Sequence, residues 1–175
     1  MGATSSAYQS TWFQETYPDY IYKQFEPSYI PINCAKNILN DIYPEKENDD
    51  PLVIRMVEKG KRLYVLSKLL PHEDEYRLIG YTETQLKDCY KHEAVIWDMF
   101  IQNSLLQVHD PDVIKNYIGD SPKTHELGEG APGNIGSFAG WQIVKKYMKN
   151  NSSISLKQLL NTDAETLFQE AKYKP

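Results

Sequence analysis

The sequence predicts a mainly α-helical protein. Apolar residues recur three and four positions apart over several segments, helix-capping residues stand before these segments, and prolines follow them. The alternating runs and Asn-Gly turns that predict strands and hairpins do not occur in the sequence. With 175 residues, of which 41% are apolar, the chain is predicted to form one compact multi-helix domain over residues 1–175.

The first third of the chain is divided by prolines. Residues 1–31 are rich in aromatic residues and proline, and predict an irregular lead-in with one helical turn before Tyr17. The helical body is expected over residues 33–175. Its first helix is predicted over residues 33–43, with Asn33 as the cap, and a charged connector follows.

A second helix is predicted over residues 50–70. Asp50 is its expected cap and Pro51 its first residue, because the missing N–H of proline costs nothing at that position. Gly60 inside this helix costs about 1 kcal/mol relative to alanine, so close packing is expected to compensate. A polar loop is predicted over residues 72–81.

The longest helix is predicted over residues 82–106, where Thr82 and Gln85 form a capping box. A short helix is expected to start at Pro111, behind its cap Asp110.

Two more helices are predicted near the end of the chain. One runs from Ile135 to Lys149 after a glycine-rich loop, with its lysines facing solvent, and the sequence NNSSIS ends it. The last spans residues 163–171 and is expected to be capped by Thr162.

The charge balance excludes some classes of function. Nineteen basic residues are scattered among 24 acidic ones, which gives a formal net charge of −5. This chain has no electropositive surface for nucleic acid or anionic lipid. No apolar stretch approaches the roughly 18 residues that span a bilayer, and residues 1–12 lack the basic and apolar regions of a signal peptide. The chain as given is expected to be soluble.

The two cysteines, Cys34 and Cys89, form no Cys-x-x-Cys or Cys/His cluster. We expect both to be buried as small apolar residues, with a disulfide possible only in an oxidising compartment.

Histidine spacing does not complete a metal site. His72, His92 and His125 each precede a glutamate, which is the first half of the HExxH zinc motif. None is followed by a second histidine one helical turn later; the nearest approach is His125 with Glu129, in a predicted loop. No metal ligands and no cofactor are therefore predicted.

The glycine-rich stretch GEGAPGNIGSFAG, residues 128–140, is consistent with a phosphate-binding loop (a phosphate cradle), a flexible hinge or a site of close helix packing. The cradle is disfavoured because neither a strand before it nor a P-loop lysine is present. Glycines four apart lie on one helix face and admit a neighbouring helix, here expected to be the one that carries Glu93 and Trp97. Structural roles are predicted for Gly60, Gly133, Gly136 and Gly140.

Several side chains are candidates for contact with a ligand or partner. Glu93 stands one turn before Trp97 in an apolar helix, where a buried carboxylate needs a partner, either a structural group or a ligand. Aromatic side chains with polar ends supply the other candidates. The predicted contact residues are Glu93, Trp97, Trp141, Tyr64 and Tyr81.

Four stretches carry a family resemblance: MVEKGKRLYVLSKLLP (56–71), IGYTETQLKDCYKHEAVIWDMFIQNSLL (79–106), GAPGNIGSFAGWQIVKKYMKNN (130–151) and the terminal AETLFQEAKYKP. Together they resemble the GldB-like gliding-motility lipoproteins of Bacteroidetes. The resemblance implies a protein held by a lipid anchor, absent from this chain, at the periplasmic face of the outer membrane. It implies as partners the protein components of the gliding and secretion machinery.

The family resemblance also implies a distant kinship with zincin-like peptidases, and hence a degenerate zincin-like C-terminal helical part. The segment where HExxH would fall, residues 5–14, has no histidine. Lys59 stands before Gly60, where the third metal ligand would be needed, and Glu58 points another way on a helix. These departures suggest an inactive peptidase-like scaffold.

Three hypotheses of function follow. The first is a non-catalytic envelope component that acts through protein contacts. The second is a zinc-dependent hydrolase whose ligands lie partly outside this chain or come from His92, Glu93 and His125. The third is a small-molecule binding module that uses Trp97, Trp141 and the tyrosine surfaces.

Overall fold

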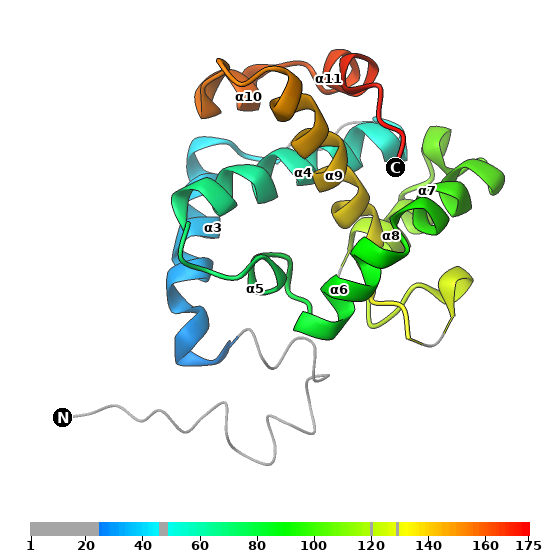
Figure 1. The fold of residues 1–175 in the computed structure, drawn as a ribbon, viewed down its shortest axis with the longest axis horizontal. Helices are drawn as coiled ribbons and strands as arrows, with labels where there is room; N and C mark the ends of the chain where they lie inside the picture. The colour runs from blue at the N-terminus through cyan, green and yellow to red at the C-terminus, as the bar shows by residue number, and fades with distance from the viewer. Residues whose placement is uncertain (1–24, 46–48, 120, 129) are drawn as a thin grey trace.

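The computed structural model describes residues 25–45, 49–119, 121–128 and 130–175 (Figure 1). Within these ranges the only β pairing is one isolated antiparallel bridge between Lys123 and Pro132, so the prediction of a mainly α protein is confirmed. The described α-helices are α3 (Ile30–Ile42), α4 (Leu52–Leu69), α5 (Glu75–Ile79), α6 (Glu83–Lys91), α7 (Glu93–Gln102), α8 (Pro111–Ile118), α9 (Ile135–Asn150), α10 (Leu156–Asn161) and α11 (Ala164–Ala171). Short 3₁₀ turns are η2 (Pro27–Tyr29), η3 (Leu105–Gln107) and η4 (His125–Leu127).

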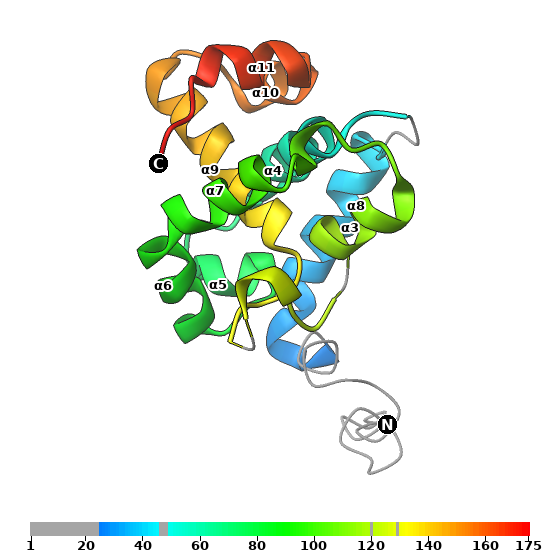
Figure 2. The same ribbon diagram turned by 90° about the vertical axis from the view of Figure 1, so that its right-hand side faces the viewer.

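Helices α4 and α9 cross at the centre of the fold, and the other helices pack around them (Figures 1 and 2). Every residue of α9 from Ile135 to Val144 is buried, because α4, α7, α8 and α11 all contact this helix. Helices α3 and α5 pack against α4. The burial of apolar side chains at this crossing contributes favourably to folding.

The two central helices meet backbone to backbone. A Cβ atom added to Gly140 would overlap the carbonyl group of Met56, and one added to Gly60 would overlap the carbonyl group of Gly140. A Cβ atom added to Gly136 would lie 2.9 Å from a side-chain methyl of Ile118 and 2.9 Å from the Tyr117 carbonyl oxygen of α8. The helix that packs against Gly140 of α9 is therefore α4. The prediction that the helix of Glu93 and Trp97, α7, would pack there is wrong. Helix α7 carries bulky aromatic side chains and contacts α9 less extensively than α4 does.

The capping predictions for α6 and α8 are confirmed. Thr82 Oγ1 accepts a hydrogen bond from the Gln85 backbone N–H at 3.2 Å, and Gln85 Oε1 accepts one from the Thr82 N–H at 2.9 Å. Asp110 Oδ1 accepts from the Asp112 N–H at 2.9 Å. These bonds satisfy donors that a helix start leaves without partners.

The prediction of one long helix over residues 82–106 is wrong. The chain leaves helical geometry at His92, with φ −110° and ψ 22°, so that α6 and α7 are separate helices. The break lets α6 pack on α5 while α7 packs on α9, which one straight helix could not do. The longest described helix is α4, with 18 residues.

Two other predicted starts are also wrong. Helix α3 begins at Ile30 with Pro31 in its first turn, so Asn33 lies inside the helix and does not cap it. Helix α4 begins at Leu52 without a side-chain cap; the Leu52 N–H donates instead to the Val108 carbonyl at 2.8 Å. Asp50 is consequently left out of the helix start.

Near the C-terminus the structure contains a helix that was not predicted, α10, and the cap of α11 is a different residue from the predicted one. Ser155 and Gln158 form a capping box that starts α10, directly after the segment NNSSIS. Asp163 caps α11, whereas Thr162 was expected to do so. The segment predicted as a polar loop before Thr82 contains the short helix α5. The helical turn predicted before Tyr17, like most of the lead-in, lies outside the described residues.

The cysteines differ in environment. Cys89 is buried, as predicted, but Cys34 is exposed on α3, and both are free thiols. Burial, reinforced by the charge of Asp88, raises the pKa of Cys89 to about 12. The Cys89 thiol is therefore protonated at neutral pH and shielded from solvent.

Alkylation is expected to distinguish the two thiols. Maleimide should modify Cys34 stoichiometrically in the native protein at pH 7 and leave Cys89 unmodified until the protein is unfolded in guanidinium chloride. Intact mass measured against time gives the number of adducts. Two adducts forming at similar rates in the native protein would contradict this placement of Cys89.

Candidate functional site

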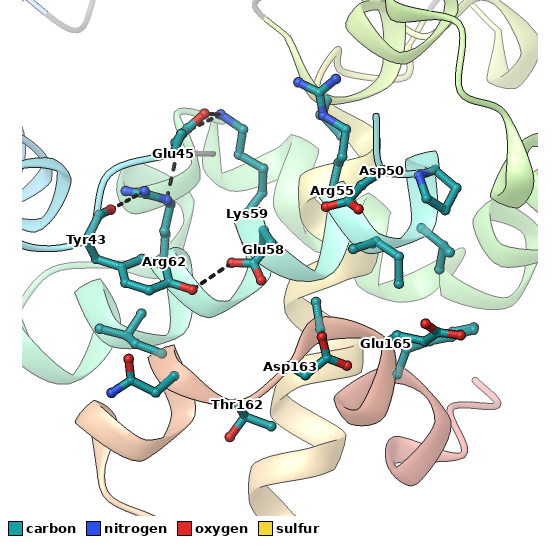
Figure 3. A pocket seen from close by; sticks show the side chains of 18 of the residues that line it. Tyr43, Glu45, Asp50, Arg55, Glu58, Lys59, Arg62, Thr162, Asp163 and Glu165 are labelled. Carbon is teal, nitrogen blue, oxygen red and sulfur yellow. Dashed lines mark hydrogen bonds and ion pairs between the residues drawn. The ribbon is translucent and has the colours of Figure 1, made fainter. Parts of the chain in front are cut away.

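A groove of about 620 Å³ lies between α4 and the start of α11, and we call it the α4–α11 groove (Figure 3). Its walls come from parts of the chain far apart in sequence: the segment before α4, the outer face of α4, and the junction of α10 with α11. Its volume is in the range of ligand sites in proteins. The charged side chains that line it are Glu45, Asp50, Arg55, Glu58, Lys59, Arg62, Asp163 and Glu165.

At one end of the α4–α11 groove, opposite charges are paired within the chain. Lys59 Nζ donates to both carboxylate oxygens of Glu45, at 2.8 and 3.0 Å. Arg62 donates to the backbone carbonyl of Tyr43, and its guanidinium lies 5.4 Å from the centre of the Tyr43 ring. Burial alone would raise the pKa of Glu45, but Lys59 and Arg62 outweigh it and lower the pKa. Figure 3 shows these contacts as dashed lines at this end of the groove.

Glu58 holds a buried lysine. Lys61 is fully buried on α4, and its Nζ donates to Glu58 Oε1 at 2.8 Å and to the Thr162 carbonyl at 2.5 Å. Tyr43 donates to the other oxygen of Glu58, at 3.1 Å. Burial and the charge of Glu58 raise the pKa of Tyr43 to about 12. The Glu58 carboxylate thus neutralises a cation that also ties α4 to the α10–α11 junction.

At the other end of the groove the charges are not paired with each other. Asp50, Asp163 and Glu165 make no ion pair with the described residues, and neither does Arg55. Figure 3 places Asp163 and Glu165 on the α11 wall and Asp50 and Arg55 on the α4 wall. We call this the carboxylate end of the groove.

A second surface lies on α3. Ile30, Ile38 and Ile42 are 58%, 60% and 71% exposed, and with Cys34 they are spaced four residues apart along the helix. This spacing keeps them near one face. Exposed apolar rows of this kind are unusual on a monomer and are typical of contact surfaces.

The predicted contact residues do not converge on one site. Glu93 is half-buried at the start of α7, where its Oε1 accepts a hydrogen bond from the Tyr173 hydroxyl at 2.6 Å. The Tyr173 ring packs edge-on against Trp97, with ring centres 5.0 Å apart. The partner that the Glu93 carboxylate needs is thus the C-terminal tail of the chain.

The other three predicted residues lie apart from these. Trp141 is fully buried, and Lys145 Nζ lies 4.1 Å from the centre of its ring. The buried Tyr81 donates to the Gly133 carbonyl at 2.9 Å and so fixes the loop before α9. Tyr64 is half-buried beside Lys68. None of these residues lines the α4–α11 groove.

Lys145 was expected to face solvent but is largely covered. Its Nζ donates to Glu75 at 2.7 Å and to the Tyr90 hydroxyl at 2.6 Å. Burial lowers the pKa of Lys145, and the Glu75 carboxylate opposes part of that effect. The contact joins α9 to α5 and α6.

The hydrogen bond from the Tyr173 hydroxyl to Glu93, which we call the Tyr173–Glu93 clasp, predicts a loss of stability at alkaline pH. Burial raises the pKa of Tyr173 above its ordinary value of 10.0, and the hydrogen bond and charge of Glu93 act in the same direction. Stability that depends on a raised pKa is present below pH 10 and is lost as the pH rises above it. Tyr173→Phe should therefore flatten the fall in melting temperature above pH 10, while costing about 1 kcal/mol at pH 7.

Thermal melts at pH 7, 9, 10 and 11 measure this effect. Tyr64→Phe is the control, since the Tyr64 hydroxyl makes no hydrogen bond with the described residues. If the Tyr173 variant lost stability above pH 10 as steeply as the unmodified protein, the clasp would not be a source of the alkaline sensitivity.

The histidines of the alternative zinc hypothesis are not gathered in one place. No group of three His, Cys, Asp or Glu side chains among the described residues is arranged to hold a metal ion. His92 is exposed at the break between α6 and α7, and His125 starts η4. Glu129, the near partner of His125, lies outside the described residues.

Comparison with known proteins gives one match. Neither a curated protein nor a solved structure matches the chain. No helix in the described part of the chain is long and apolar enough to cross a membrane. The sequence model of the gliding motility protein GldB, a lipoprotein family, matches residues 1–175. The chain therefore belongs to the family of gliding motility protein GldB, which relates it to gliding motility and to the cell envelope.

Proposed function

We propose that the chain is a non-catalytic, periplasm-facing component of the gliding and secretion machinery. In this proposal residues 1–175 form one domain with its helical body over residues 33–175. A lipid anchor holds the protein at the outer membrane, and the domain works by protein contacts on a degenerate peptidase-like scaffold. No cofactor takes part.

The observation that carries this proposal is the set of contacts made by Glu58 and Lys59. These residues directly precede Gly60, where the family resemblance would put a third metal ligand. Glu58 is bound to the buried Lys61 and to Tyr43, and Lys59 is bound to Glu45. The Glu58 carboxylate neutralises a buried ammonium, and giving it to a metal would leave that ammonium unpaired, which is destabilising.

Two surfaces support a role in protein contact. The α4–α11 groove has an unpaired, charged end, and the α3 face exposes a row of isoleucines. The isoleucines of the α3 face are exposed, and so are Asp163 and Glu165 at the carboxylate end of the groove.

Metal analysis tests the proposal against a zinc hydrolase. We expect the purified native gene product, its lipid-modified cysteine replaced to make it soluble, to contain no stoichiometric zinc after dialysis against zinc-containing buffer. His92→Ala and the matched control His72→Ala should behave like the unmodified protein, since both histidines are exposed. One zinc per chain that disappears in His92→Ala and persists in His72→Ala would overturn the non-catalytic proposal.

A further inference from the structure

We infer that the carboxylate end of the α4–α11 groove binds a lysine or arginine of a partner protein, presented by an extended segment with an adjacent apolar residue. This inference rests on the proposed function and names the chemistry of the partner.

The charge of the groove supports a cationic occupant. At the other end of the groove the described carboxylates already hold cations of this chain, Glu45 with Lys59 and Glu58 with Lys61. At the carboxylate end Asp50, Asp163 and Glu165 line the groove with one cationic side chain, Arg55, whose guanidinium points away from Asp163 and Glu165 in Figure 3. The Thr166 hydrogen bonds and the charge of Lys61 lower the pKa of Asp163, so Asp50 and Glu165 supply the negative charge that is left without a cation of this chain. An excess of negative charge between two walls attracts and orients a positively charged side chain.

Local structure does not account for two of these carboxylates. Asp50 stands where a cap of α4 was expected, but α4 begins without a side-chain cap. Glu165 accepts only a 3.3 Å hydrogen bond from Gln169, one turn along the same helix. Asp163 differs, because its Oδ1 caps α11 by accepting from the Thr166 N–H at 2.8 Å. Asp50 and Glu165 are thus the carboxylates that are free to bind a partner.

Apolar residues line the groove at this end: Val53 and Ile54 of α4, and Ala164 and Phe168 of α11. Val53 and Ala164 are buried, so the half-buried Ile54 and Phe168 supply the accessible apolar surface. A cationic side chain can bury its aliphatic stem on such a surface while its charged group reaches the carboxylates. A neighbouring apolar residue of the same segment gains from the same surface, which favours a protein segment over a small polar ion.

Binding of a short peptide tests this inference. The probe is the blocked pentapeptide Ala-Lys-Leu-Lys-Ala, with Ala-Glu-Leu-Glu-Ala as the control peptide, titrated into the zinc-free protein and followed by amide chemical shifts and by calorimetry. Asp50→Lys combined with Glu165→Lys reverses the charge of the groove. Asp88→Lys combined with Asp98→Lys makes the same change in net charge on exposed residues outside it.

We expect the lysine peptide to bind the unmodified protein and to shift the amides of residues 50–55 and 163–169. The groove variant should bind roughly tenfold more weakly, and the control variant should retain its affinity within about twofold. Circular dichroism should show both variants folded, since neither replaces a buried side chain or a cap.

Three results would overturn the inference: no binding of the lysine peptide, equal weakening in both variants, or a small molecule that copurifies in the groove and is released on denaturation. Each of these leaves the proposed function intact if the protein is zinc-free. Stoichiometric zinc lost in His92→Ala would instead overturn the proposed function, and this inference with it.

Discussion

Gly140→Leu is expected to lower the free energy of unfolding by about 3 kcal/mol or more, the upper range for overpacked cores. The reason is the contact between backbones at the crossing of α4 and α9. A Cβ at position 140 would overlap the carbonyl group of Met56, which cannot move aside as a side chain could. Urea unfolding followed by circular dichroism measures the loss.

Gly130→Leu is the matched control for this prediction. A Cβ at Gly130 meets no atom within 4 Å, and the residue does not have a positive φ. Its replacement should change stability by about 0.5 kcal/mol or less, as is usual for exposed positions. If Gly140→Leu were no more harmful than Gly130→Leu, the helices would not be held together at this glycine contact.

Glu58→Leu is the second substitution with a large expected effect. It leaves the ammonium of Lys61, whose side chain is only 1% exposed, with the Thr162 carbonyl as its remaining partner. Removing one member of a buried ion pair costs about 3–5 kcal/mol. Because the side chain of Glu58 is 35% exposed, we expect about 2–3 kcal/mol here, measured by urea unfolding.

A second substitution should repair most of this loss. Lys61→Met in the Glu58→Leu background removes the unpaired cation and keeps an apolar side chain of similar length, so the double variant should be more stable than Glu58→Leu alone. Glu45→Leu is the control, since the Glu45 side chain is 52% exposed and its partner Lys59 is half-buried near the surface, and exposed pairs contribute about 0–1 kcal/mol. A double variant less stable than either single variant would show that the Glu58 carboxylate has a further structural role.

Features encoded by neighbouring residues could be predicted from the sequence. The capping box at Thr82 and the cap at Asp110 depend on residues three positions apart, and the structure contains both. The break at His92 could not be predicted, because the apolar spacing is helical on both sides of it. The break results from the different partners of α6 and α7. Asp50 resembles a cap in sequence, but Val108, far along the chain, takes that role.

The candidate site was missed for the same reason. Lys61 and Thr162 are 101 residues apart in sequence, and their hydrogen bond joins two walls of the α4–α11 groove. The sequence signal for this contact is the pair of lysines that flank Gly60, because a lysine that a helix crossing buries needs an acidic partner; the structure buries Lys61 and leaves Lys59 half-buried. The predicted contact residues Glu93 and Trp97 are a carboxylate and an aromatic residue within an apolar helix, and in the structure both contact Tyr173.

We propose that this chain supports gliding by binding a partner through the α4–α11 groove, and that the Glu58 carboxylate has no catalytic part in it. The most direct measurement is the gliding speed of a strain that lacks the gene and is complemented with its native full-length product. With equal amounts of protein in the envelope, Glu58→Leu with Lys61→Met should restore gliding, and Asp50→Lys with Glu165→Lys should not. If the first variant failed and the second restored gliding, the Glu58 carboxylate itself would be required and the account would be wrong.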